Sequence, residues 1–307
     1  MFVWNVDPNL FFLPDWLMDG RGIRYYGVLY ALALMGGFYF WRWQMLRGGH
    51  EEKVAEQFLT IGVLAVILGA RLGHVFFYDW DKYKDHLWEI PKFWKGGLAS
   101  HGTTVALIGV LIWFARRHGL RVREVLDRIA MAVAWAASLV RIGNFMNSEI
   151  VGRVTDGAIK VKFPLHDYDK LVPCDSCGTV AKDVCDFIAR GKGPGQCVSF
   201  ANVPWRHPSQ IYEALMGAGI LVLLLLVDRR LGEKRPLGLL GFLFIFTYFL
   251  GRFLVEYVKE FQTASTGLTR GQQLSIPLIL VGLIGLVFTL ARPERTPPGK
   301  LSKPAEA

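Results

Sequence analysis

The chain has 307 residues, of which 52% are apolar, and a formal net charge of +9. Soluble domains already reach about 45–50% apolar residues, so the distribution of these residues decides the class. They come in long runs separated by short charged segments, which is typical of a multispanning helical membrane protein and not of a soluble domain. The positive charge does not indicate a nucleic-acid partner, because the basic residues cluster in the short loops between apolar runs. Met1–Asp7 lacks a basic region, so we expect no cleavable signal peptide.

Seven apolar runs are long enough to cross a bilayer as helices, and they predict an all-α polytopic membrane protein. The predicted spans are residues 23–43, 54–77, 98–114, 128–146, 211–227, 237–258 and 274–290. The run at 128–146 is rich in alanine, and small residues allow membrane helices to pack closely.

The spans divide the chain into five segments. These are an interfacial amino-terminal segment (1–22), the first four spans (23–152), a head with four cysteines (153–208), the last three spans (209–291) and a tail (292–307). The first segment could hold a short amphipathic helix, since it carries prolines and tryptophans among polar residues. The proline-rich tail is predicted to be disordered.

Charge in the loops predicts the orientation. Alternate loops differ in their content of lysine and arginine, and the loop at 115–128 carries five arginines. The more basic side of a membrane protein is the cytoplasmic one. The amino terminus and the cysteine-containing head are therefore predicted outside, in the periplasm, and the carboxyl terminus in the cytoplasm.

The stretch Arg141–Arg153, RIGNFMNSEIVGR, follows the apolar run 129–140 and holds two arginines, two asparagines, one carboxylate and two glycines. Arginine near hydrocarbon is costly and tends to mark function. Its guanidinium group suits bidentate binding of phosphate or carboxylate. The alternative is a loop that re-enters water with ordinary interfacial arginines, which fits such a dense polar cluster less well.

Polar residues from six or seven spans are predicted at one depth, near the outer headgroups. They are Tyr26, Arg71, His74, His101, Arg141, Asn144, His207, Glu213, Arg252, Glu256, Gln272, Gln273 and Ser275. Scattered structural residues would not all lie in the same leaflet. The set therefore predicts one pocket.

Arg252 and Glu256 are spaced i,i+4, so they share a helix face. Taken alone, they predict a buried ion pair that only fixes helix packing. Together with Arg141 they suggest a second hypothesis, in which two guanidinium groups bind a phosphodiester and Glu256 holds one of them.

His101 lies in the motif Gly97-Leu-Ala-Ser-His-Gly102. A lone histidine at a membrane interface is often structural. Its near-neutral titration also suits a general base, and both interpretations stay open.

These motifs resemble the prolipoprotein diacylglyceryl transferase family, over nearly all of residues 20–290 and in the family's order. The strongest match is Arg141–Arg153. The others are Arg24-Tyr-Tyr-Gly27, Gly97–Gly102, His207-Pro-Ser-Gln-Ile-Tyr-Glu213, Arg252-Phe-Leu-Val-Glu256 and Gln272-Gln-Leu-Ser-Ile-Pro277.

The resemblance implies a bacterial inner-membrane enzyme without cofactor or metal. It would transfer the diacylglyceryl group of phosphatidylglycerol to the lipobox cysteine of a prolipoprotein signal peptide, releasing glycerol phosphate. Its partners would be membrane lipid and the precursor, and no nucleic acid. The resemblance implies His101, Arg141 and Arg252 as catalytic residues. The implied substrate-binding residues are Arg141, Tyr26, Asn144, Asn147, Glu149, Gly152, Tyr248 and Glu256.

The chain departs from the family pattern at four places. Thr103, Val140 and Ser148 stand where the family usually has glycine, which weakens arguments about close backbone approach more than those about charge. The segment 165–203 is longer than the family's usual connection, so the resemblance says nothing about it.

That long segment holds all four cysteines: Cys174, Cys177, Cys185 and Cys197. In an oxidising compartment they predict two disulfides with three pairings open. A four-thiolate zinc site is the alternative, although only the first pair has the tight spacing that zinc favours.

Two other classes of function remain. A transporter should carry polar residues through the whole bilayer depth, whereas the cytoplasmic halves of these spans read as apolar. A lipid-binding subunit without chemistry would tolerate loss of Arg141 or His101 in any activity assay.

Overall fold

The computed structural model describes residues 1–12, 22–77, 79–92, 100–173, 185–187, 197–260 and 267–294. Helices occur at all seven predicted positions. Five of them are long and apolar enough to cross a membrane: α3 (Glu52–Phe77), α6 (Val122–Met146), α7 (Ser209–Leu231), α8 (Leu239–Val255) and α9 (Arg270–Ala291). The other two are α2 (Tyr25–Arg47) and α5 (Ser100–Arg117). The chain is therefore a multi-pass helical membrane protein.

The chain forms two compact units. The first comprises residues 1–37, 131–226 and 243–285, and the second comprises residues 38–130, 227–242 and 286–307.

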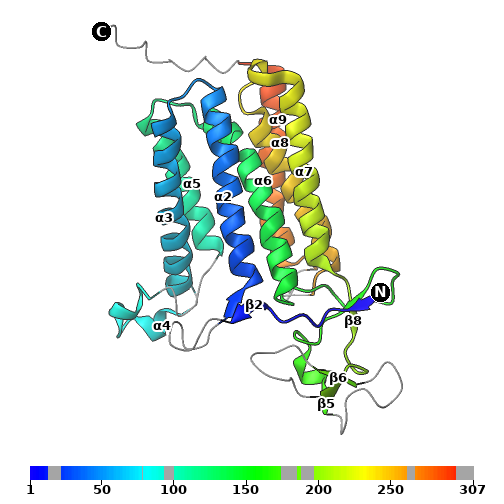
Figure 1. Ribbon diagram of the computed structural model, residues 1–307. Coiled ribbons are helices and arrows are strands. Elements are labelled where there is room, and N and C mark those ends of the chain that lie inside the picture. The colour runs from blue at the N-terminus through cyan, green and yellow to red at the C-terminus, as the bar shows by residue number, and fades with distance from the viewer. Residues whose placement is uncertain are drawn as a thin grey trace. The chain divides into compact units, whose positions relative to one another are not determined.

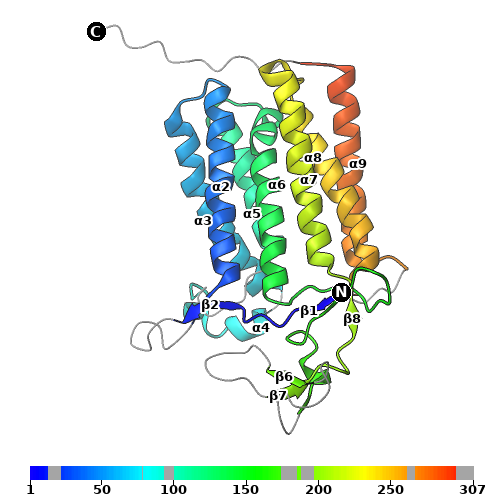
Figure 2. The same ribbon diagram turned by 45° about the vertical axis from the view of Figure 1, so that its right-hand side comes forward.

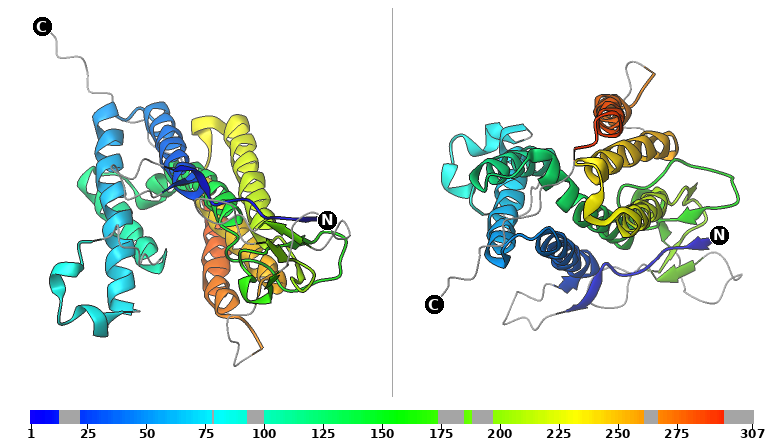
Figure 3. Two further views of the ribbon diagram at one scale, coloured as in Figure 1. Left: turned by 60° about the horizontal axis from the view of Figure 1, so that its bottom comes forward. Right: turned by 90° about the horizontal axis from the view of Figure 1, so that it is seen from above.

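In the first unit, neighbouring helices are joined by one side-chain hydrogen bond and by close contacts at glycines. The indole Nε1 of Trp135 on α6 donates to the carbonyl of Leu32 on α2 at 3.1 Å. A glycine lies at each of three further contacts, namely Gly217 of α7 against Ser138, Gly251 of α8 against Met216, and Gly282 of α9 against Phe246. The part of α8 in this unit therefore packs between α7 and α9, and Figures 2 and 3 both show this arrangement.

Short strands join the ends of these helices. β1 (Phe2–Val3) pairs in parallel with β4 (Val161–Lys162), and β4 pairs antiparallel with β8 (Trp205–Arg206). The chain that follows α6 runs beside β8, where Thr155 N–H donates to the carbonyl of Trp205 at 2.8 Å. This pairing fixes the residues Arg141–Arg153, called the polar stretch below, against the start of α7.

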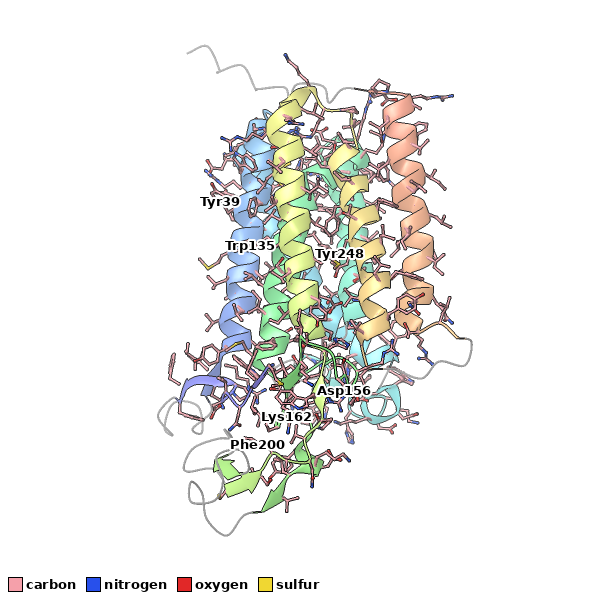
Figure 4. All side chains as sticks on the ribbon, turned by 90° about the vertical axis from the view of Figure 1, so that its right-hand side faces the viewer. Tyr39, Trp135, Asp156, Lys162, Phe200 and Tyr248 are labelled. Atoms are coloured by element: carbon pink, nitrogen blue, oxygen red, sulfur yellow. The ribbon has the colours of Figure 1, made fainter. Side chains whose placement is uncertain are left out.

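A second small sheet lies further along the head. It has the order β5 (Val172–Pro173), β7 (Cys197–Ser199), β6 (Cys185–Phe187), and Figure 1 shows β5 and β6 beyond β8, away from this unit's helices. Val198, Phe200 and Val203 form its apolar core. The ammonium group of Lys162 donates to the carbonyl of Phe200 at 2.8 Å, and Figure 4 labels both residues.

The amino-terminal segment is extended in its described part. β2 (Asn9–Phe12) and β3 (Gly22–Arg24) form an antiparallel pair that leads directly into α2. The helix considered for this segment could only fall within residues 13–21, which lie outside the described residues. The tail from residue 295 lies outside them as well.

Buried ion pairs lie at or beyond the ends of the predicted apolar spans in the second unit. In the second unit, Arg235 and Asp228 are both fully buried and paired at 2.8 Å, and Arg47 contacts both oxygens of Asp228 at 2.6 and 2.9 Å. Arg128 pairs with Glu233 at 2.7 Å. Because each cation has a carboxylate partner, charged residues can extend a helix, and α6 begins at Val122 instead of residue 128.

In the same unit, α3 and α5 cross at a very short distance. A Cβ atom at Gly102 would overlap the carbonyl oxygen of Gly69 and lie 2.6 Å from the Cα of Gly73. The hydroxyl of Thr103 donates to the carbonyl of Val66 at 3.3 Å. Glycine follows His101 here because two helix backbones touch at that position.

Cys197 forms a disulfide. That bond disfavours a four-thiolate zinc site and agrees with the predicted disulfides. Cys185 lies on β6, whereas Cys174 and Cys177 lie outside the described residues.

Candidate active site

Three cationic side chains meet at one buried carboxylate, that of Glu213 in the second turn of α7. Glu213 is 2% exposed. Its Oε2 lies 3.1 Å from Nε of Arg141, and its Oε1 lies 3.2 Å from Nζ of Lys259 and 3.7 Å from Nη1 of Arg252. Arg141 lies in the last two turns of α6, Arg252 lies in the last turn of α8, and Lys259 follows the 3-10 turn Glu256–Val258. The two arginines predicted to act together therefore lie within reach of a single small anion.

The cations around Glu213 lie close to one another. A second carboxylate, Glu256, has its Oε2 3.9 Å from Nζ of Lys259, and its Oε1 accepts a hydrogen bond from Thr269 at 3.0 Å. Burial lowers the pKa of Lys259, Glu213 opposes that shift, and the charges of Arg141 and Arg252 add to it. The site thus holds cations close to one another, which favours the binding of an anion.

The prediction that Glu256 holds Arg252 is wrong, because Glu213 is the carboxylate that contacts this arginine. The i,i+4 spacing assumes a continuous α-helix, but α8 ends at Val255 and Glu256 begins a 3-10 turn, Glu256–Val258. The tighter turn changes the direction of the side chain, and Glu256 contacts Lys259 and Thr269 instead.

On its other side, Arg141 joins a chain of amides. Its Nη1 donates to Oδ1 of Asn144 at 3.2 Å, and Nδ2 of Asn144 donates to Oε1 of Glu149 at 2.9 Å. Nδ2 of Asn147 donates to the same oxygen at 3.3 Å. The asparagines and the carboxylate of the polar stretch thereby orient the guanidinium group.

The turn after α6 adopts a backbone that non-glycine residues rarely take. Ser148 has φ 54° and Ile150 has φ 57°, and the left-handed region costs an L-residue roughly 1–2 kcal/mol. This geometry explains why the family usually has glycine where this chain has Ser148. The turn brings the side chain of Glu149 back toward the last turn of α6.

Gly152 lies where three segments converge. Its N–H donates to the carbonyl of His207 at 3.0 Å, and a Cβ atom here would lie 2.6 Å from Cβ of His207 and 2.7 Å from the carbonyl oxygen of Val258. The neighbouring Arg153 N–H donates to that same Val258 oxygen at 2.9 Å. Only glycine fits, because a side chain would separate the polar stretch from the start of α7 and the end of α8.

Two tyrosines lie on the helices that carry the site. A Cβ at Gly143 would lie 2.7 Å from Cδ2 of Tyr26, so the ring of Tyr26 packs directly on the polar stretch. Tyr248 stacks on Phe244 with ring centroids 5.3 Å apart, and it precedes Arg252 by one helical turn (Figure 4).

His101 belongs to the first turn of α5 in the second unit, and its side chain lies outside the described residues. Its role stays a prediction. Arg71, also placed in the predicted pocket, is buried in that second unit and donates to the carbonyls of Ile90 and Glu89 at 2.7 and 3.0 Å. Arg71 therefore fixes the loop after α3.

Lys259 was not among the predicted site residues, and Glu213 was placed in the predicted pocket without a role there. Glu213 was visible in the His207–Glu213 motif at the start of an apolar run, but nothing in its spacing related it to Arg141. Lys259 follows Glu256 by three residues at the end of a span, where a lysine is usually an interfacial anchor.

A sequence model of the prolipoprotein diacylglyceryl transferase family matches residues 17–288. The chain belongs to this family. Three similar relatives are each named phosphatidylglycerol–prolipoprotein diacylglyceryl transferase. The relative from Glaesserella parasuis is 32% identical over 296 residues (94% of each chain), that from Vibrio cholerae is 34% identical over 301 residues (94% of this chain and 93% of the relative), and that from Proteus mirabilis is 32% identical over 303 residues (95% of each chain).

All of the site lies inside the segment that the prolipoprotein diacylglyceryl transferase family model covers, from Tyr26 to Gln272. The long head falls within that segment too. The relatives cover almost the whole chain, so the similarity is not confined to the polar stretch.

Proposed function

We propose that this chain transfers the diacylglyceryl group of phosphatidylglycerol to the thiol of a lipobox cysteine in prolipoproteins, with release of glycerol phosphate. Arg141, Arg252 and Lys259 bind the lipid phosphate. The observation that carries this proposal is their convergence on the one buried carboxylate of Glu213. Family membership and the names of the relatives support the reaction.

The chemistry needs positive charge at the leaving group. The thiol sulfur attacks the glyceryl carbon that bears the phosphate, a carbon–sulfur bond forms, and the carbon–oxygen bond to phosphate breaks. The phosphodiester carries one negative charge and the departing monoester gains a second. Guanidinium and ammonium groups already in place stabilise this developing charge without reorganisation.

The remaining residues shape the site around the phosphate. Asn144, Asn147 and Glu149 orient Arg141, and Gly152 keeps the polar stretch close to the ends of α7 and α8. Tyr26, Tyr248 and Glu256 complete the walls.

His101 is the proposed base for the thiol. A cysteine thiol has a reference pKa of about 8.5, so it is mostly protonated at neutral pH and needs a base or a positive field.

The proposed topology has seven spans in the bacterial inner membrane, with the amino terminus outside and the carboxyl terminus in the cytoplasm. In this topology the site faces the periplasm. The head, residues 153–208, also lies there, and it connects the first four spans (23–152) to the last three (209–291). The excess of basic residues in alternate loops supports this orientation.

A transfer assay tests the reaction. Purified protein is incubated with phosphatidylglycerol and a lipobox peptide, and the peptide mass is measured. We expect a gain of one diacylglyceryl group that requires the cysteine. Folded protein that gives no gain with phosphatidylglycerol or other anionic lipids would reject the proposal.

Arg252→Lys tests the phosphate-binding role. Lysine keeps the charge but loses the bidentate fork, and a charge-assisted hydrogen bond contributes about 1.5–3 kcal/mol. We therefore expect kcat/KM to fall about 10- to 100-fold. Arg230→Lys, at an exposed position of α7, is the matched control and should keep the wild-type rate. A near-normal rate for Arg252→Lys would contradict the role.

A further inference from the structure

We propose that Ser209 and Gln210, in the first turn of α7, are positioning residues. They hold the turn Ser148–Ile150 in its left-handed conformation and thereby orient Arg141 toward the lipid phosphate. This inference rests on the proposed function and adds to it, because neither residue belongs to the predicted site.

The turn needs an external restraint. Ser148 and Ile150 are the non-glycine residues with positive φ in the described part of the chain, at 54° and 57°. Ile150 is β-branched, which makes such a φ value particularly unfavourable, and its side chain is 43% exposed. Packing of that side chain therefore does little to stabilise the conformation.

The restraint comes from two buried side chains. Nε2 of Gln210 donates to the carbonyl of Glu149 at 2.8 Å, and Oγ of Ser209 donates to the carbonyl of Ile150 at 3.0 Å. Both side chains are 0% exposed. Two successive carbonyls of the strained turn are thus held by one helical turn that solvent does not reach, where hydrogen bonds are strongest.

The held turn acts on Arg141 through the carboxylate of Glu149. That carboxylate accepts from Asn144, and Asn144 accepts from Nη1 of Arg141. Glu213 follows Gln210 by three residues on the same helix and contacts Nε of Arg141. Both edges of the guanidinium group are therefore positioned from the first two turns of α7.

A purely structural role predicts a different pattern. If Gln210 only anchored the loop, its loss would lower stability without a specific effect on lipid turnover. If it holds the left-handed turn, its importance must depend on how costly that conformation is. Glycine at position 148 makes a positive φ accessible, so Ser148→Gly should reduce the dependence on Gln210.

The experiment measures kcat and KM for phosphatidylglycerol with a lipobox peptide, and the thermal midpoint, for Gln210→Leu, Ser148→Gly and the double variant. We expect Gln210→Leu to lower kcat/KM on the order of ten- to a hundredfold, as misplacement of a reacting group does. The double variant should recover a substantial part of this loss. Gln44→Leu, at a fully buried glutamine of the second unit, is the control and should lower the midpoint without changing kcat.

Ser209→Ala is the milder variant if Gln210→Leu fails to fold, because it removes a single hydrogen bond. Wild-type kcat/KM in both folded variants would overturn the inference, as would an equal loss with and without Ser148→Gly. A second readout is the rise in thermal midpoint on adding glycerol phosphate, which should shrink in Gln210→Leu and not in Gln44→Leu. If the wild-type protein shows this rise but no transfer, the proposed function fails while the positioning role stands. If glycerol phosphate raises the thermal midpoint equally in Gln210→Leu and Gln44→Leu, the positioning role is rejected.

Discussion

At the scale of single residues, Lys259 shows how burial changes the chemistry of a side chain. It directly follows the spanning helix, and its ammonium group lies 3.2 Å from Oε1 of Glu213. Burial lowers its pKa below the ordinary value of a lysine, and the nearby charges of Arg141 and Arg252 lower it further, against the opposing effect of Glu213. Its proton is therefore lost at a lower pH than that of an exposed lysine.

This shift predicts the alkaline limit of the transferase. Protonated Lys259 contributes to phosphate binding, and that contribution is lost as pH rises through its lowered pKa. Lys259→Arg stays charged and should extend activity to higher pH. The measurement is kcat/KM for phosphatidylglycerol against pH in both proteins. The substrate thiol titrates identically in the two, so the difference between the profiles reports on Lys259, and identical alkaline limbs would contradict the prediction.

At the scale of elements, glycines decide how closely the helices approach. The same residue type has different roles on one helix, as α5 shows. Gly102 faces the backbone of α3 at Gly69 and Gly73, whereas a Cβ at Gly109 would meet nothing within 4 Å. Close approach of this kind is a main source of helix association in membranes, where no hydrophobic driving force separates lipid from protein.

These two glycines provide a matched pair of variants. Gly102→Ala places a methyl group into a backbone contact and should destabilise the protein by about 1–3 kcal/mol, as overpacking does. Gly109→Ala should leave stability unchanged or raise it by up to about 1 kcal/mol, through helix propensity. Thermal unfolding in detergent measures both. Equal midpoints for the two variants would show that the α3–α5 crossing is not tightly packed.

At the scale of the whole molecule, the charges fall into two kinds. Several of those buried within the second unit form ion pairs, as Arg235 does with Asp228. Exposed arginines such as Arg116, Arg117, Arg229 and Arg230 lie in the last turns of α5 and α7. Under the proposed topology these arginines lie on the cytoplasmic side, where exposed cations are retained because they resist transfer across the bilayer.

The orientation can be tested with reporter fusions. A fluorescent protein that folds only in the cytoplasm should be fluorescent after residue 307, and an alkaline phosphatase that folds only in the periplasm should be active when inserted in the head near residue 158. The reverse insertions are the controls and should be silent. Phosphatase activity at the carboxyl terminus would contradict the proposed topology.

Much of the fold can be predicted from the amino-acid sequence. Apolar runs place all seven helices to within a few residues, because a helix that crosses lipid must satisfy its own backbone hydrogen bonds and cover them with apolar side chains. The start of α6 is the main exception, since paired charges extend the helix beyond its apolar part. The polar stretch and its arginines are also evident, because such residues rarely occur at the end of a span without a role.

The partners within the site depend on the tertiary structure. Spacing along α8 pointed to Glu256 as the carboxylate for Arg252, yet Glu213 from another helix holds Arg252, Arg141 and Lys259 together. A local pattern reports on residues within one helical turn, and a 3-10 turn after Val255 is enough to redirect a side chain. Composition and periodicity thus establish which segments enter the membrane and which residue types gather at their ends. Ion pairing falls off over a few ångströms, so only the packing of α6, α7 and α8 decides which charges meet.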